Sequence, residues 1–333
     1  MRMRRACGAL MAAGLGLWLG ACSTGDETAQ DAAKGTTDSI GHGGRQQTEV
    51  SAADDPALTA ILDEVQSKFV QESFADAETG VTLEYNLFVP DGYDPGASYP
   101  LIAFIHDDSV TGKDVEAALT QGYGGVIWAT AEEQAKHASF VLAPEFATST
   151  IEGGIGQSGE AVVEAQVNTF LHLLDKLQTD YSIDPDRLYG TGQSMGCMTM
   201  FYLNGHYPDL FAATLYVAGQ WDVAQLEALR DEAFFYIVAA GDDQASGGQG
   251  DLKASFDSAG VAYSTTELDA TWDEAQSDEA VEAVLAEGTG HYFAAFAKGT
   301  VLSPGQRTEH VASFNHGYTI PAVRDWLFTQ TRL

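Results

Sequence analysis

Residues 187–197 have the sequence Arg-Leu-Tyr-Gly-Thr-Gly-Gln-Ser-Met-Gly-Cys, which contains the motif Gly192-Gln193-Ser194-Met195-Gly196. A short apolar strand pattern comes directly before this motif, and a helical pattern follows it. A sharp turn from a strand into a helix lifts a serine hydroxyl out of the sheet, toward a base and an oxyanion site. The flanking glycines leave room for a strained backbone and for close packing of helix on strand. The context of the motif, more than its five letters, therefore indicates that Ser194 is a nucleophile.

The composition allows a large core and excludes one class of partner. The chain has 333 residues, of which 45% are hydrophobic, so it can bury one large domain or two ordinary ones. Lys and Arg total 16 and Asp and Glu total 48, which gives a formal net charge of −32. Removal of the three arginines of the leader described below brings this charge to about −35. A surface this acidic repels phosphate backbones, so we expect no nucleic-acid partner.

The first residues have the pattern of a targeting segment. Three arginines near the start are followed by an apolar stretch, residues 10–19, that is too short for an ordinary spanning helix. The stretch ends in Leu19-Gly20-Ala21-Cys22, which resembles a bacterial lipobox. We expect a lipoprotein signal peptide at residues 1–21 and a lipid on Cys22, which would tether an exported protein to the bacterial cell envelope, on the surface or periplasmic side of a membrane. The alternative is a plain secretory signal that is cut near Ala21.

The segment after the leader differs in composition from the rest. Residues 22–55 are rich in Ser, Thr, Gly, Asp and Gln and have almost no large apolar residues, which predicts a flexible polar tether. No second linker follows, so residues 56–333 are interpreted as one catalytic domain. Cys7 would leave with the leader and Cys22 would carry lipid. Cys197 then has no partner, and we expect a buried thiol and no intrachain disulfide.

Strand and helix patterns alternate along residues 56–333. Alternation of this kind indicates βαβ units and a mostly parallel central sheet with helices on both faces. In such sheets the functional site lies beyond the carboxyl ends of the strands. The predicted strands are Val81–Val89, Leu101–Ile105, Phe140–Ala143 (ended by Pro144), Arg187–Thr191 (after a stop at Asp184-Pro185-Asp186), Phe211–Val217, Phe234–Ala240 and Tyr263–Leu268. The predicted helices are an entry helix around Leu58–Phe69, then Val162–Leu177, Asp251–Ser258 and Pro321–Gln330.

A serine nucleophile needs a base, and the base needs an acid that orients it. In this architecture the chain order is Ser, then acid, then His. The strand Phe234–Ala240 is followed by Gly241-Asp242-Asp243, where a carboxylate stands just past the carboxyl end of a buried strand. Asp242 is therefore the predicted acid and Asp243 its alternate.

Three histidines follow the predicted acid in the chain. His291 precedes an apolar run and has the position of the first residue of a strand. His310 and His316 are expected in the loop before the final helix, where a base can reach over Ser194. The residues alone leave both of these histidines open.

An oxyanion needs two hydrogen-bond donors. One is expected to be the backbone N–H of Met195, the residue after the nucleophile. The other should come from the loop after the strand Leu101–Ile105, and the backbone N–H of Asp107 is the predicted donor. The carboxylate of Asp107 is negative, so we expect it to point outward and to bond within its own loop.

Several stretches of residues 80–330 together resemble a group of secreted α/β-hydrolases that are described as predicted peptidases or prolyl-oligopeptidase-like esterases. The stretches are Tyr85-Asn86-Leu87-Phe88-Val89-Pro90, Pro100 to His106, Phe140 to Pro144, Ile183 to Tyr189, Gly192 to Gly196, His310-Val311-Ala312-Ser313-Phe314 and Ala322 to Phe328. The resemblance implies an α/β-hydrolase fold, hydrolysis of carboxylic esters, and His310 as the base, because the catalytic His of that group opens the His-x-x-Ser-Phe segment. Asp107 and Cys197 depart from the group, in which glycine is common at both positions.

The leading hypothesis is a surface-anchored serine carboxylesterase with Ser194, His310 and Asp242 as its triad. It would act on a small-molecule or polymeric ester and would need no metal, no cofactor and no protein partner. A polyester or feruloyl-type esterase is a narrower version, in which Trp128, Trp221 and Trp272 would line a groove; core packing is the commoner use of Trp. A prolyl-oligopeptidase-type serine peptidase would use the same triad. A surface binding protein with an idle triad is the alternative outside enzymes.

Overall fold

The computed structural model describes residues 55–153 and 161–332. The predicted signal peptide, the lipid site at Cys22 and all but the last residue of the predicted tether fall outside those ranges, so they stay predictions. Within the described ranges, no helix combines the length and the apolar character needed to cross a bilayer.

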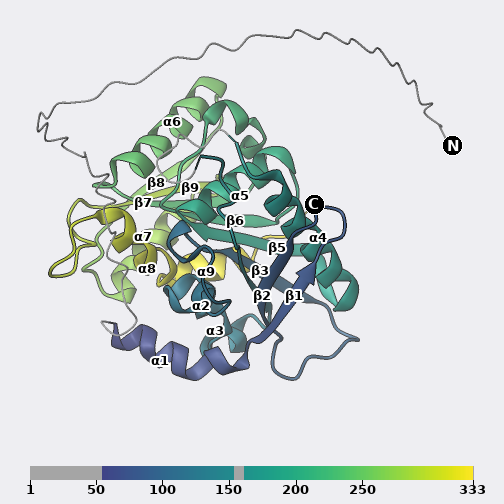
Figure 1. The fold of residues 1–333 in the computed structure, drawn as a ribbon. Coiled ribbons are helices and arrows are strands. Elements are labelled where there is room, and N and C mark those ends of the chain that lie inside the picture. The colour runs from purple at the N-terminus through teal and green to yellow at the C-terminus, as the bar shows by residue number, and fades with distance from the viewer. Residues whose placement is uncertain (1–54, 154–160, 333) are drawn as a thin grey trace, which may run out of the picture. The chain divides into compact units, whose positions relative to one another are not determined.

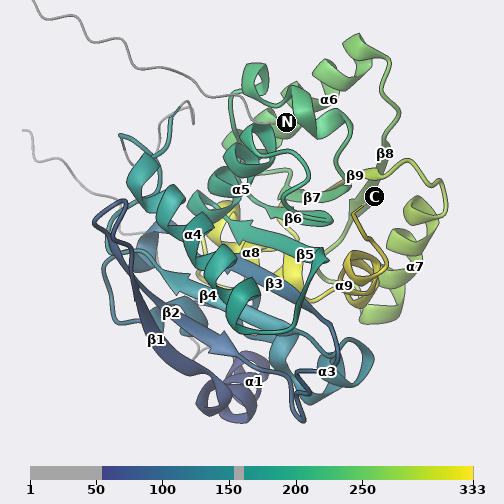
Figure 2. The ribbon, with the colours of Figure 1, turned by 90° about the vertical axis from the view of Figure 1, so that its right-hand side faces the viewer.

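A twisted sheet forms the centre of the described part, in which nine strands are hydrogen-bonded in the order β1-β2-β4-β3-β5-β6-β7-β9-β8 (Figures 1 and 2). Neighbouring strands run parallel from β4 to β8, whereas β1–β2 and β2–β4 are antiparallel. The predicted mostly parallel sheet is therefore confirmed. The strands are β1 (Val70–Ala75), β2 (Thr82–Phe88), β3 (Tyr99–Ile105), β4 (Phe140–Glu145), β5 (Ile183–Gln193), β6 (Ala213–Val217), β7 (Phe234–Ala239), β8 (Ser264–Leu268) and β9 (His291–Phe296).

Helices cover both faces of the sheet, because the strands alternate the face to which each apolar side chain points. Figure 2 shows helices on the two sides of the sheet. On β3, Ile102 and Phe104 pack in one core with α1, α2, α7, α8 and α9, while Leu101 and Ile105 pack in a second core with α4, α5 and α6. The helices are α1 (Pro56–Val65), α2 (Ala117–Thr120), α3 (Ala131–Lys136), α4 (Glu164–Asp180), α5 (Met195–His206), α6 (Asp243–Ala259), α7 (Glu274–Leu285), α8 (Glu309–Tyr318) and α9 (Pro321–Phe328).

Three of the differences from the predicted element boundaries have a clear local cause. β4 continues through Pro144 to Glu145, paired with β2. Its pairing with β3 ends at Leu142, so the missing N–H of Pro144 interrupts no hydrogen bond to β3. β5 already begins at Ile183, which pairs with Tyr99 ahead of an irregular register. α6 begins at Asp243 instead of Asp251, since Asp242 caps it with a side-chain oxygen and starts the helix early.

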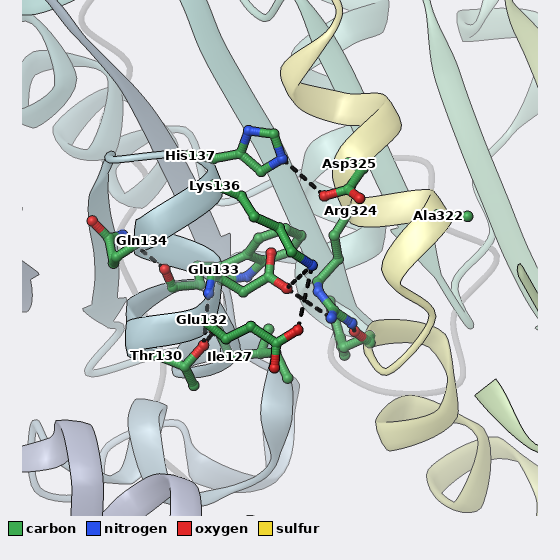
Figure 3. Close-up of polar contacts among 12 residues, drawn as sticks. Ile127, Thr130, Glu132, Glu133, Gln134, Lys136, His137, Ala322, Arg324 and Asp325 are labelled. Carbon is green, nitrogen blue, oxygen red and sulfur yellow. Dashed lines mark hydrogen bonds and ion pairs between the residues drawn. The ribbon is translucent and has the colours of Figure 1, made fainter. Parts of the chain in front are cut away.

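A buried ion pair joins α9 to α3 (Figure 3). The Arg324 guanidinium lies 2.8 Å from a carboxylate oxygen of Glu133, and both side chains are almost fully buried. Arg324 also donates to the main-chain oxygen of Tyr318 at 2.7 Å, so it is hydrogen-bonded to the last residue of α8 as well. His137, the residue directly after α3, forms a second contact with α9 through Asp325, at 2.8 Å and nearer the surface. This cluster connects α9 to α3 and to the end of α8.

We expect the substitution Arg324→Met to lower the free energy of unfolding by about 3–5 kcal/mol, because it leaves the Glu133 carboxylate buried without its main partner. Urea denaturation monitored by circular dichroism measures this loss. The double variant Glu133→Met/Arg324→Met removes both charges and should recover much of it, since an apolar pair of similar volume often matches a buried ion pair. A single variant within about 1 kcal/mol of the wild type would contradict the stabilising role assigned to the pair.

Candidate active site

The turn between β5 and α5 holds Ser194 in a strained conformation. Ser194 has φ +51° and ψ −115°, a region that costs a side-chain-bearing residue of order 1–3 kcal/mol. Glycines make the turn possible: a Cβ on Gly192 would lie 2.5 Å from the carbonyl carbon of Gly196, and one on Gly196 would lie 1.9 Å from the main-chain oxygen of Ile105. The two motif glycines therefore let the start of α5 close against β5 and β3. The Ser194 hydroxyl is lifted to the carboxyl edge of the sheet.

Three side chains from distant segments form a hydrogen-bonded chain at this edge. The Ser194 Oγ lies 2.9 Å from Nε2 of His310, and Nδ1 of His310 lies 2.6 Å from an oxygen of Asp242. An ionised carboxylate only accepts, so Nδ1 carries the proton and Nε2 is left to accept from the serine hydroxyl. The structure thus brings together the three residues that the sequence analysis chose. Their catalytic roles remain a prediction.

The histidine stands on a helix, which corrects the expected loop. His310 is the second residue of α8, and its ring contacts Phe314 one turn later, edge to face, with ring centres 5.1 Å apart. Its side chain is 23% exposed, so the imidazole is partly accessible to solvent. The segment contains polar and apolar residues without a clean stripe, so its helical character was not evident from periodicity.

Asp242 connects the site to the start of α6. One carboxylate oxygen accepts from the N–H of Ala245 at 3.3 Å and caps the helix, while the other faces His310. This double use fixes the carboxylate in the orientation that the imidazole needs.

The alternates lie outside this chain of hydrogen bonds. Asp243 is the exposed first residue of α6. His316 packs against the ring of Phe296, and burial lowers the pKa of its imidazole. His291 opens β9, as predicted, and its Nδ1 bonds to the main-chain oxygen of Ala262 at 2.9 Å.

The two predicted oxyanion donors, the N–H groups of Met195 and Asp107, differ in whether a side chain already accepts from them. Met195 is the first residue of α5, where helix geometry offers no acceptor for its N–H. The N–H of Asp107 donates to the side-chain oxygen of Gln121 over a long 3.3 Å. An oxyanion that uses Asp107 therefore has to take the place of this amide oxygen. Gln121 was missed in the sequence, because nothing in its surroundings marks it.

The Asp107 side chain corrects one expectation and agrees with another. It bonds within its own loop, where one oxygen accepts from the N–H of Ser109 at 2.8 Å, but it is buried and does not point outward. Its other oxygen accepts from the amide of Gln193 at 3.1 Å, and the same amide donates to Gln121 at 2.7 Å. The residue before the nucleophile therefore partly offsets the negative charge near the oxyanion site.

His106 fixes the backbone of the oxyanion loop. Its Nδ1 donates to the main-chain oxygen of Asp107 at 2.7 Å, and its Nε2 accepts from the N–H of Phe146 at 3.0 Å. Full burial lowers the pKa of His106, so the ring is neutral and both nitrogens are used. In this structure His106 therefore holds the loop in place.

The cysteine and most of the tryptophans that the sequence analysis singled out are buried. Cys197 is fully buried in α5, just after the turn that holds Ser194, and burial raises the pKa of its thiol. Trp128 and Trp221 are buried in the two cores, whereas Trp272 is partly exposed. Two of the three tryptophans therefore do not line a surface groove. Among the described residues, no group of three or more His, Cys, Asp or Glu side chains is placed to hold a metal ion.

Comparisons with known proteins agree with this architecture. Residues 158–245, which include Ser194 and Asp242, match the model of the prolyl oligopeptidase family. A thermostable esterase of known structure is 25% identical, with a TM-score of 0.64 over 82% of this chain. The protein has an α/β-hydrolase fold. The predicted resemblance to peptidase-like esterases is confirmed. The aligned part covers 64% of the thermostable esterase, so this chain spans less than two thirds of its length.

Two further solved structures match the chain at lower similarity. A feruloyl esterase module from Clostridium thermocellum, complexed with sinapinate, is 14% identical over 77% of this chain and 86% of that one, with a TM-score of 0.48. A ferulic acid esterase from Anaeromyces mucronatus, in complex with ferulic acid, is 12% identical over 77% of this chain and 91% of that one, with a TM-score of 0.44. No curated protein matches the chain.

Proposed function

We propose that this α/β-hydrolase is a serine carboxylesterase that works through an acyl-enzyme, with Ser194 as nucleophile, His310 as base and Asp242 as the orienting acid. The observation that carries the proposal is the unbroken chain of hydrogen bonds, 2.9 Å and 2.6 Å long, that starts at a serine held in a strained turn. Strain of this kind is typical of functional sites, where the surrounding fold stabilises it.

The geometry supports the following steps. As Ser194 Oγ attacks the acyl carbon, its proton passes to Nε2 of His310, and the Asp242 carboxylate stabilises the imidazolium that forms. The N–H groups of Met195 and Asp107 donate hydrogen bonds to the developing oxyanion, after the Gln121 side-chain oxygen has left the N–H of Asp107. His310 then gives its proton to the leaving alcohol. A water molecule, activated by the same histidine, hydrolyses the acyl-enzyme and restores Ser194.

The proposal places the enzyme outside the cytoplasm, tethered by a lipid on Cys22 through the polar segment 22–55. Its support is the sequence alone: a basic start, a short apolar stretch and a segment that resembles a lipobox. Such an anchor holds the catalytic domain near a membrane surface without any helix that crosses it.

A serine peptidase is the second candidate, favoured by the match of residues 158–245 to the prolyl oligopeptidase family. The test compares hydrolysis of p-nitrophenyl butyrate with that of a prolyl peptide p-nitroanilide by the same purified chain. We expect kcat/KM to be at least about 100-fold higher for the ester, together with a burst of p-nitrophenol equal to the enzyme concentration. A preference for the anilide would replace the esterase with the peptidase.

A fluorophosphonate probe separates both enzymes from an inactive binding protein. The probe phosphonylates a serine only when a base removes its proton, so an active triad leads to a stoichiometric adduct on Ser194 that mass spectrometry identifies. A chain that gives neither adduct nor burst would contradict the proposed function.

A further inference from the structure

The carboxylate of Glu309, next to His310 in the chain, joins two separate loops at the candidate site. One oxygen accepts from the backbone N–H of Gly241 at 2.9 Å, and the other accepts from the N–H of Gly299, also at 2.9 Å. The side chain is only 8% exposed. Glu309 has no part in the steps described above, and it carries no sequence signal beyond its position before His310.

The two loops leave neighbouring strands at the edge of the sheet where the site lies. Gly241 follows β7 and Gly299 follows β9, and these strands are paired as far as Ala239 and Phe296. Gly241 also directly precedes Asp242. A ring of contacts is thereby closed: Glu309 holds the backbone beside Asp242, Asp242 bonds to His310, and His310 follows Glu309 in α8.

The chain leaves room for this carboxylate on both sides. A Cβ on Gly241 would lie 2.1 Å from the Glu309 side chain, so the close approach requires glycine there. Gly299 has φ +86°, a conformation that favours glycine. A buried carboxylate is costly unless it is hydrogen-bonded, and here each oxygen has a backbone donor while the first turn of α8 favours negative charge. The two loops are therefore shaped to accommodate this side chain and to hydrogen-bond both of its oxygens.

We infer that Glu309 is a positioning residue for the acid and the base of the triad. By tying the Gly241–Asp242 backbone to the first turn of α8, it keeps the Asp242 oxygen in line with Nδ1 of His310 while the imidazole gains and loses its proton. The inference rests on the proposed function. A misplacement of about 1 Å in such a group typically costs on the order of 100-fold in rate.

The substitution Glu309→Gln tests this role with almost no change of shape. It turns one acceptor oxygen into an NH₂ donor that faces a backbone N–H, so one contact becomes repulsive. We expect kcat on p-nitrophenyl butyrate to fall by about 10- to 100-fold, with KM changed by less than about threefold, because the loss affects the transition state and not substrate binding.

Glu232→Gln is the matched control. Glu232 is also a buried carboxylate that accepts from a backbone N–H, that of Asp209 at 2.7 Å, but it lies ahead of β7, at the other end of that strand from Asp242. We expect this variant to lose thermal stability and to keep the wild-type kcat. Should Glu309→Gln prove too unstable to assay, Gly241→Ala displaces the same carboxylate and should show the same loss of kcat.

A double-mutant cycle separates positioning from a general loss of structure. If Glu309 acts through Asp242, then adding Glu309→Gln to Asp242→Asn should lower the residual rate by less than about threefold. Two results would overturn the inference while leaving the proposed function in place. In one, Glu309→Gln lowers kcat by the same factor in the wild type and in Asp242→Asn. In the other, the kcat of Glu309→Gln stays within about threefold of the wild type. Wild-type turnover by Asp242→Asn alone would contradict the role that the proposed function gives to Asp242, and the inference with it.

Discussion

Ser194→Ala is expected to lower kcat for p-nitrophenyl butyrate by about 10⁴- to 10⁶-fold, the range found when a triad nucleophile is removed. Alanine has no hydroxyl to attack the acyl carbon, so no acyl-enzyme forms and the burst of p-nitrophenol disappears. The rate that remains comes from substrate binding and the oxyanion donors, which the substitution leaves in place. Burst kinetics at high enzyme concentration measure both effects in one experiment.

The fold of this variant should be unchanged. The hydroxyl bonds to His310 and alanine takes the same backbone conformation, so we expect the melting temperature to move by no more than about 3 °C. Ser258→Ala is a matched control on the exposed side of α6, where the lost hydroxyl donates to the main-chain oxygen of Ala254, and it should keep full activity. A folded Ser194→Ala enzyme with more than about a tenth of the wild-type kcat would rule out Ser194 as the nucleophile.

The sheet was predictable where strands are buried and apolar on both faces. Leu101–Ile105 and Phe234–Ala239 are continuous apolar runs that pack between two helix layers, and their sequences show it. β1 was missed because it lies at one edge of the sheet with most of its side chains exposed, so the sequence has no clear apolar pattern there. α7 was missed for a similar reason: only Val281 and Val284 of its twelve residues are buried.

The candidate site was predictable to the extent that each residue has a local signal. Ser194 lies in a motif, and Asp242 follows a buried strand. His310 and His316 could not be separated by position, because the segment was expected to be a loop; on a helix, six residues correspond to about 240° of rotation, so the two rings face different ways. The contacts of Gln121 and Glu309 arise where several loops meet, and no periodicity or spacing within one segment encodes such a meeting.

Asp242→Asn is expected to lower kcat by about 10⁴-fold while leaving the fold almost intact. Asparagine keeps an oxygen that can cap α6, and it is as good a capping residue as aspartate, so the cost to stability is small. Toward His310 the amide presents an NH₂ group, which favours the tautomer with the proton on Nε2. That nitrogen then faces the Ser194 hydroxyl as a donor and has no lone pair to accept the proton.

Asp243→Asn provides the control for this experiment, because it makes the same chemical change on the neighbouring, exposed carboxylate. We expect its kcat to stay within about twofold of the wild type, since a solvated charge outside the hydrogen-bonded chain contributes little to the transition state. The two variants have the same net charge, so a difference between them isolates the bond from Asp242 to His310 from any effect of overall charge. A large loss in Asp243→Asn, with Asp242→Asn nearly as active as the wild type, would transfer the orienting role to Asp243 and would require the loop after β7 to rearrange during turnover.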